Sequence, residues 1–187
     1  MATVDELLHA AEERMGKSVE HAKTEFNTVR TGRASTSLLD RIEIDYYGTP
    51  TPLKQLATIN VPEPRMLTIQ PFDPGSMRAI EKAIQESDLG LMPSNDGKII
   101  RLPIPQLTEE RRKELVKIVR GLAEGHRIAV REIRRDAIKH LKDLVDGGEV
   151  GADEEHRGED RVQKLTDDHT KQIDELLKHK EAEVMEV

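Results

Sequence analysis

The chain has 187 residues, no cysteine, no tryptophan, four aromatic residues and 35% charged residues, with a formal net charge of −7. The absence of cysteine excludes disulfides, thiolate metal sites and thiol nucleophiles, and no apolar run is long enough to span a membrane. We expect a cytoplasmic protein, because charged residues interrupt the first turns and no apolar signal core can form there. So much charge leaves disorder as the alternative to long helices, and hydrophobic periodicity has to decide between them.

A long helix is the first element that the sequence predicts, over about residues 4–29. Apolar residues recur at steps of three or four and form one stripe: Val4, Leu8, Ala11, Met15, Val19, Ala22, Phe26 and Val29. Such a stripe is typical of a helix that packs against a partner. All nine prolines then fall between Pro50 and Pro105. Because proline breaks helix interiors, we expect two helical flanks around a different kind of insert.

The insert, residues 31–105, has the pattern of a small α+β domain. Ile42, Ile44 and Tyr46 alternate with polar residues, which predicts a strand that ends at Gly48 and Pro50. Further short strands are expected over 56–61, 66–69 and 99–104, the last after an Asn-Asp-Gly turn at 95–97. A single helix is expected over 76–87.

The second flank predicts two more helices. Thr108 is a suitable N-cap, and an apolar stripe of about 38 residues follows it until Gly147-Gly148. We expect the acidic stretch 149–160 to be a solvated loop and a third helix to run from about Val162 to Val184. Three stripes that each need a partner predict an antiparallel three-helix bundle, made of residues 1–30 and 106–187.

Two chain segments join the insert to the bundle, and both contain residues that interrupt helices. They are Thr31 and Gly32 on the way out and Pro103, Ile104 and Pro105 on the way back. Glycine permits a sharp change of direction, and the prolines prevent a helix from continuing across the junction. The two segments either hold one fixed angle or form a hinge, and we expect a hinge.

Basic residues are concentrated on the second helix. From Arg111 to Lys142 there are 11 basic and 4 acidic residues, whereas from Asp143 to the end there are 6 basic and 15 acidic residues. Most of the basic side chains step by three or four residues and form what we call the basic row: Lys113, Lys117, Arg120, Arg127, Arg131, Arg134, Arg135 and Lys142. Such a row suits a polyanion. The alternative is a solvated face that the acidic third helix partly neutralises.

Residue patterns typical of enzymes are missing. The chain has no phosphate-binding glycine-rich loop, and no second histidine completes a zinc site with His21 and Glu25. His126 and His169 lie on apolar stripes, where core histidines are the simpler interpretation. The acidic residues of 154–160 could bind a divalent ion weakly, although a solvated loop explains them better. We therefore predict a binding protein that is not an enzyme and has no cofactor or metal.

Six motifs, in order along the chain, resemble the bacterial ribosome recycling factor family. They are Arg-Thr-Gly-Arg-Ala-Ser at 30–35, Tyr-Tyr-Gly-Thr-Pro at 46–50, Ser-Asp-Leu-Gly at 87–90, Pro-Gln-Leu-Thr-Glu-Glu-Arg-Arg at 105–112, Val-Arg and Arg-Arg within 130–135, and Ile-Asp-Glu-Leu at 173–176. Together they cover essentially the whole chain. The resemblance implies an L-shaped protein in which a three-helix bundle carries a β/α/β sandwich on a two-chain hinge.

The resemblance also implies a function in translation. Members of the family bind the post-termination ribosome through large-subunit ribosomal RNA and, with elongation factor G and the GTP that this partner hydrolyses, split it into subunits. By motif position, RNA contact is implied for Arg131, Arg134 and Arg135, and less directly for Arg30, Arg33, Arg111 and Arg112. The spacing of the basic row adds Lys113, Lys117 and Arg127.

The partners that we expect are therefore the ribosome and elongation factor G, with no membrane and with the chain as a monomer. The alternative is an adaptor or chaperone whose long helices bind another protein. Salt dependence separates the two, since phosphate contacts release counterions and give a steep slope.

Overall fold

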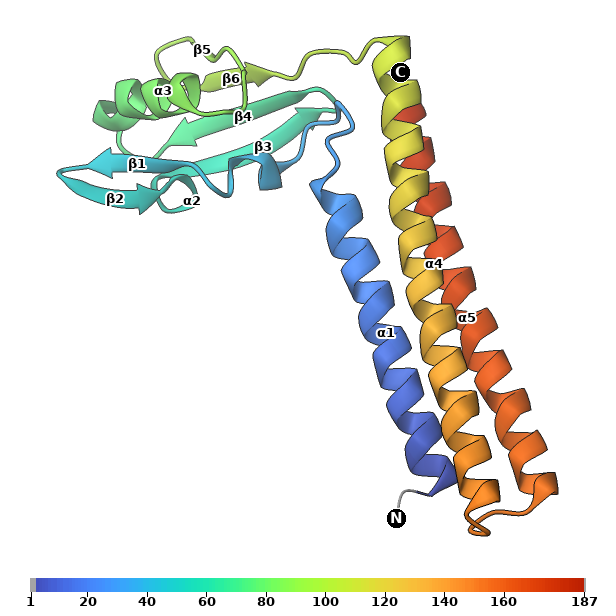
Figure 1. The fold of residues 1–187 in the computed structure, drawn as a ribbon. Coiled ribbons are helices and arrows are strands. Elements are labelled where there is room, and N and C mark those ends of the chain that lie inside the picture. The colour runs from blue at the N-terminus through green and yellow to red at the C-terminus, as the bar shows by residue number, and fades with distance from the viewer. Residues whose placement is uncertain (1–2, 187) are drawn as a thin grey trace. The chain divides into compact units, whose positions relative to one another are not determined.

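Helices α1 (Val4–Thr28), α4 (Glu109–Asp146) and α5 (Ala152–Met185) run side by side in this computed structural model, which describes residues 3–186 (Figure 1). Helix α4 is antiparallel to both neighbours. Contacts divide the chain into two units, one made of the residues up to Arg30 with Glu109–Glu186 and the other of Thr31–Thr108. The expected mixture of long helices with a small sheet domain is confirmed.

The bundle core consists of the predicted apolar stripes. Val4, Leu8, Met15 and Phe26 of α1 pack in one cluster with residues of the other two helices, among them Val119, Val130, Ile133, Leu141, Val162 and Ile173. At its start α1 has a capping box, in which the Thr3 hydroxyl accepts from the Glu6 N–H and the Glu6 carboxylate accepts from the Thr3 N–H. Hydrophobic periodicity could predict these helices, because each one buries a single apolar face.

One prediction for the bundle was wrong: most of the acidic stretch 149–160 is helical. Helix α5 begins at Ala152, with Asp153, Glu154 and Glu155 in its first turn. Carboxylates there are favoured by the partial positive charge of a helix N-terminus. The buried Gly158 lies one turn before Val162, so close to α4 that an added Cβ would lie 3.0 Å from the Leu141 side chain. Because glycine has no apolar side chain, the apolar stripe of the third helix could not be followed in the sequence before Val162, and the first turns of α5 were missed.

The second unit contains two small sheets. Strands β1 (Glu43–Tyr46) and β2 (Thr49–Pro52) form an antiparallel pair. The other sheet is antiparallel with the order β3-β4-β6-β5, and its strands are β3 (Ala57–Glu63), β4 (Met66–Pro71), β5 (Ser94–Asn95) and β6 (Ile100–Pro103). The unit also contains helix α3 (Met77–Glu86), the short helix α2 (Leu53–Leu56) and two 3₁₀ turns, Thr36–Leu39 and Pro74–Ser76.

The core of this unit is aliphatic and continuous. It includes Ile44 of β1, Leu67 and Ile69 of β4, Ile80 and Ile84 of α3, and Ile100 and Leu102 of β6. The alternation of β1, β4 and β6 could be predicted because each strand buries one face.

Strand β2 was not predicted, because Pro50 and Pro52 argue against a strand. They lie at alternate positions of a strand that pairs only with β1, opposite Asp45 and Glu43. An edge strand tolerates proline where the missing N–H would point away from its partner.

Candidate nucleic-acid interface

The basic row divides into side chains on the open surface of α4 and side chains held against α5. On the open surface, the side chains of Lys113, Arg131 and Arg135 are 66%, 52% and 69% exposed. Lys117 and Lys142 are exposed as well. Lys113 pairs with Glu109 one turn earlier, and Arg135 pairs with Glu132 at 3.8 Å. Ion pairs this exposed are weak, so these cations are available to a polyanion.

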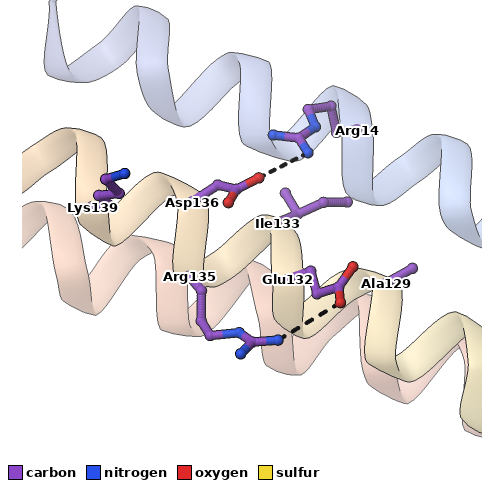
Figure 2. A pocket seen from close by; sticks show the side chains of 7 residues that line it. All are labelled: Arg14, Ala129, Glu132, Ile133, Arg135, Asp136 and Lys139. Carbon is purple, nitrogen blue, oxygen red and sulfur yellow. Dashed lines mark hydrogen bonds and ion pairs between the residues drawn. The ribbon is translucent and has the colours of Figure 1, made fainter.

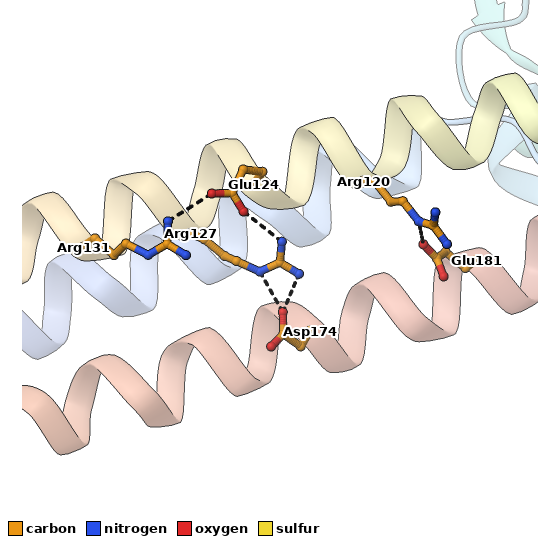
Figure 3. Close-up of polar contacts among 6 residues, drawn as sticks. All are labelled: Arg120, Glu124, Arg127, Arg131, Asp174 and Glu181. Carbon is orange, nitrogen blue, oxygen red and sulfur yellow. Dashed lines mark hydrogen bonds and ion pairs between the residues drawn. The ribbon is translucent and has the colours of Figure 1, made fainter.

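Arg127 belongs to the other group, since its side chain is only 21% exposed. Its Nε donates to Asp174 of α5 at 2.8 Å and its Nη1 donates to Glu124 at 3.1 Å, while its Nη2 forms an ion pair with Asp174 at 2.6 Å (Figure 3). Arg120, whose side chain is 64% exposed, also donates from its Nε to a carboxylate of α5, Glu181, at 2.5 Å. These arginines connect α4 to α5, a role that helical spacing could not separate from phosphate binding.

Glu124 joins the two groups. It accepts from Arg127 with one carboxylate oxygen and from Arg131, at 3.0 Å, with the other. The hydrogen bonds from Arg127 and then from Arg131 lower the pKa of Glu124. The Glu124 carboxylate therefore neutralises part of the positive charge of the basic row.

Arg134 lies between the two groups. Its Nη1 donates to Gln163 of α5 at 2.6 Å, whereas its Nε is buried and has no hydrogen-bond partner within residues 3–186. Because the Nε is buried, a contact of Arg134 with a polyanion has to use its Nη groups.

The other predicted cations are spread over the chain. Arg111 pairs with Glu114 at 2.8 Å, and the half-buried Arg112 has a buried Nε that finds no partner in the described part of the chain. Arg30 and Arg33 are exposed near the end of α1 and the start of the second unit.

Next to the open surface, α1 and α4 line a shallow, open groove of about 540 Å³ (Figure 2). Its lining includes Arg14 of α1 together with Glu132, Arg135, Asp136 and Lys139 of α4. Arg14 Nη2 lies 3.1 Å from Asp136 Oδ2, and both side chains are about half exposed. Sequence reasoning missed Arg14, because it lies on a helix where acidic residues outnumber the cations and where Arg14, Lys17 and Lys23 form no extended row.

The residues expected to form a hinge differ in how they are held within the second unit. Pro103 ends β6, and the Ile104 N–H donates to the Arg65 carbonyl at 2.8 Å. The Ala34 N–H donates to the neighbouring Pro64 carbonyl at 2.7 Å. Gly32 has φ +74°, and an added Cβ would lie 2.9 Å from Leu107 Cγ. Thr31, Gly32 and Pro105 therefore lie outside the pair of backbone hydrogen bonds that Ala34 and Ile104 make with Pro64 and Arg65.

Both histidines on apolar stripes have partners. The buried His169 has its Nδ1 2.6 Å from the Leu165 carbonyl oxygen, and His126, 14% exposed, has its Nε2 2.8 Å from Glu25 of α1. Across residues 3–186 no group of three or more His, Asp or Glu side chains is arranged to hold a metal ion. None of the helices in the same residues is long and apolar enough to cross a membrane.

Comparisons with known proteins agree with this fold. The family model described as "Ribosome recycling factor" matches residues 22–185. The ribosome-recycling factor of Rubrobacter xylanophilus is 55% identical over 180 residues, which cover 96% of this chain and 97% of that one. The same factor from Carboxydothermus hydrogenoformans is 53% identical over 184 residues, covering 98% and 100%.

Solved structures show the same likeness. A solution structure of a ribosome recycling factor aligns over the whole of both chains with a TM-score of 0.77 and 42% identity. A second aligns over 99% of this chain and 100% of the other, with a TM-score of 0.65 and 44% identity. It belongs to models for the T. thermophilus ribosome recycling factor and the E. coli elongation factor G bound to the E. coli post-termination complex. The chain belongs to the ribosome recycling factor family.

Proposed function

We propose that this protein recycles ribosomes after translation termination. It binds the post-termination ribosome and, with elongation factor G and GTP, promotes splitting into subunits. The observation that carries this proposal is the family match over residues 22–185, together with relatives more than half identical over nearly the full chain. Because the partner hydrolyses the GTP, the protein itself acts as a binding factor and not as an enzyme. The proposal further includes that it is a monomer in the cytoplasm.

The open surface of α4 contacts large-subunit ribosomal RNA. Phosphates are bound well by guanidinium groups, which donate two parallel hydrogen bonds. Arg131 and Arg135 are more than half exposed, and the half-buried Arg134 lies between them on the same helix. Lys113 and Lys117 extend the same surface towards the start of the helix.

The remaining cations have smaller roles. Arg127 is hydrogen-bonded to Asp174 and Glu124, so its main role is to stabilise the bundle and its contribution to RNA binding is smaller. Arg111, Arg112, Arg30 and Arg33 contribute to the edge of the RNA contact.

The segments between the two units act as a hinge. While α4 holds the bundle on RNA, movement of the second unit transmits force from elongation factor G to the contacts between ribosomal subunits. A substitution of Gly32 is a poor test, because φ +74° strains any other residue regardless of motion. Pro105→Gly is better, since it loosens an exposed position outside the β6 ladder. It should leave subunit binding intact and change the splitting rate.

Sedimentation with isolated ribosomal subunits tests the proposed function. The purified protein is mixed with large or small subunits across a salt series at fixed magnesium. Saturable binding to the large subunit alone, weakening steeply with salt, supports the proposal and leads to a splitting assay with elongation factor G and GTP. An absence of binding at low salt contradicts it.

A further inference from the structure

The groove between α1 and α4 brings together cations that the sequence keeps far apart. Arg14 comes from the middle of α1, and Arg135 and Lys139 come from successive turns of α4. Figure 2 shows two separate ion pairs among these side chains, Arg14 with Asp136 and Arg135 with Glu132. Arg135 also belongs to the basic row, so the groove continues directly from the open surface of α4.

The carboxylates in the groove hold these cations only loosely. The Arg14–Asp136 pair is 54% and 53% exposed, and the Arg135–Glu132 pair is 69% and 62% exposed with a separation of 3.8 Å. Among the described residues, Lys139 makes no ion pair and is exposed. Three cations against two carboxylates leave the groove with a net positive charge. Exposed pairs of this kind exchange partners at little cost, which contrasts with the pairing of Arg127 to Asp174.

We propose that this groove is a phosphate subsite, in which Arg14 and Lys139 bind one or two backbone phosphates of the RNA that α4 contacts. This inference rests on the proposed function and extends it from one helix to two. RNA is the chosen occupant because the groove is positive and continuous with the basic row, and because guanidinium and ammonium groups are the usual phosphate ligands. The footprint thus turns from α4 towards α1, away from the arginines held against α5.

Binding in the groove involves an exchange of ionic partners. In the free protein the Asp136 carboxylate accepts from Arg14. When RNA binds, a phosphate oxygen accepts from Arg14 instead, and Asp136 returns to water. Asp136 therefore competes with the phosphate, so Arg14 and Asp136 have opposite effects on RNA affinity although they form one ion pair.

Two substitutions that break this pair separate the proposal from a structural role. In sedimentation with isolated large subunits, Arg14→Ala should weaken binding on the order of tenfold and reduce the salt slope by about one. Asp136→Asn should tighten binding several-fold, because it removes the competing carboxylate. Arg14→Lys should retain most of the affinity. Thermal unfolding should change little, and equally, in Arg14→Ala and Asp136→Asn, since both lose the same exposed pair.

Lys17→Ala is the matched control. Lys17 lies one turn from Arg14 on α1, is 67% exposed, pairs with Glu13 at 2.7 Å and does not line the groove. It should bind like the unmodified protein. The subsite is wrong if Arg14→Ala binds normally, or if Arg14→Ala and Asp136→Asn both weaken binding, while Arg135→Ala still reduces affinity. If the unmodified protein itself fails to bind the large subunit, the proposed function is wrong, and that result is distinguishable from failure of the subsite alone.

Discussion

Arginines on the α5 edge of α4 and arginines on its open surface have the same sequence signature and different surroundings. Arg127 is 21% exposed and is shared between Asp174 and Glu124, whereas Arg135 is 69% exposed with a single ion pair at 3.8 Å. Both positions fit the same helical spacing. Burial and pairing, and not spacing, therefore decide which cations stabilise the bundle and which are available to a partner.

The physical reason lies in the cost of desolvation. A half-buried guanidinium needs anionic partners, and removing it leaves its carboxylates without compensation. An exposed guanidinium is hydrated, and its ion pairs contribute little to folding. The first kind supports the shape of the surface, and the second kind can exchange water or a carboxylate for phosphate.

The largest effect on stability is expected from Arg127→Ala. It removes two hydrogen bonds to carboxylates and a further ion-pair contact with Asp174, and it leaves Asp174 and Glu124 without their shared partner. Hydrogen bonds to charged groups contribute about 1.5–3 kcal/mol each, but both carboxylates are about half exposed and regain part of this from water, so the free energy of unfolding should fall by roughly 2–3 kcal/mol. Urea denaturation measures it, with Arg135→Ala as the control that should change by less than about 0.5 kcal/mol. Equal losses in the two variants would remove the distinction between edge and open surface.

For affinity to the large subunit, we expect the reverse order, with a larger loss in Arg135→Ala than in Arg127→Ala. Arg135→Ala should weaken binding to isolated large subunits by about 1–3 kcal/mol, or roughly 5- to 150-fold, if its guanidinium binds a phosphate in a dry contact. Arg131→Ala should behave similarly. Sedimentation at fixed magnesium measures both, and unfolding curves that match those of the unmodified protein show that the loss is in binding. A parallel loss of stability would mean that these side chains are structural.

Glu124→Gln should have a smaller effect, and one that depends on pH. The pKa of Glu124 is lowered by hydrogen bonds from Arg127 and Arg131, below its ordinary 4.5. Its contribution to stability is therefore complete above pH 4.5 and is lost as the pH falls through the folded-state pKa. Glu124→Gln should be less stable than the unmodified protein at pH 7, and the two should converge at low pH. A difference that stays constant with pH would contradict this account.

Lys113→Ala should give the smallest change. Lys113 is 66% exposed and pairs with Glu109 one turn away, at 2.8 Å. Ion pairs this exposed contribute little to stability, so unfolding should hardly change in urea denaturation. The salt slope for large-subunit binding should fall by about one if Lys113 contacts a phosphate. An unchanged slope would place the end of the RNA footprint further along α4.

Much of the fold could be predicted from sequence, because most elements bury one regular face. The stripes of α1 and α4 and the alternation of β1, β4 and β6 follow directly from that requirement. The start of α5 could not be predicted, since its core position before Val162 is Gly158, a residue without an apolar side chain. Strand β2 was hidden by two prolines that an edge strand accommodates.

The candidate site could be predicted only as a row along one helix. Spacing identified Arg131, Arg134 and Arg135, but it also included Arg127, whose partner Asp174 lies on α5, 47 residues later. Arg14 was missed for the converse reason, because its position beside Asp136 depends on how α1 packs against α4. Pairing between helices depends on tertiary structure, and helical periodicity contains no information about it.

The salt dependence of large-subunit binding by an Arg131→Ala/Arg135→Ala double variant tests the central claim most directly. If the open surface of α4 binds ribosomal RNA phosphates, the log–log slope should be less steep by about two than that of the unmodified protein. Affinity should fall by more than either single substitution causes, and urea denaturation should be nearly unchanged. An unchanged slope and affinity, with large-subunit binding intact, would show that the chain binds the ribosome through another surface.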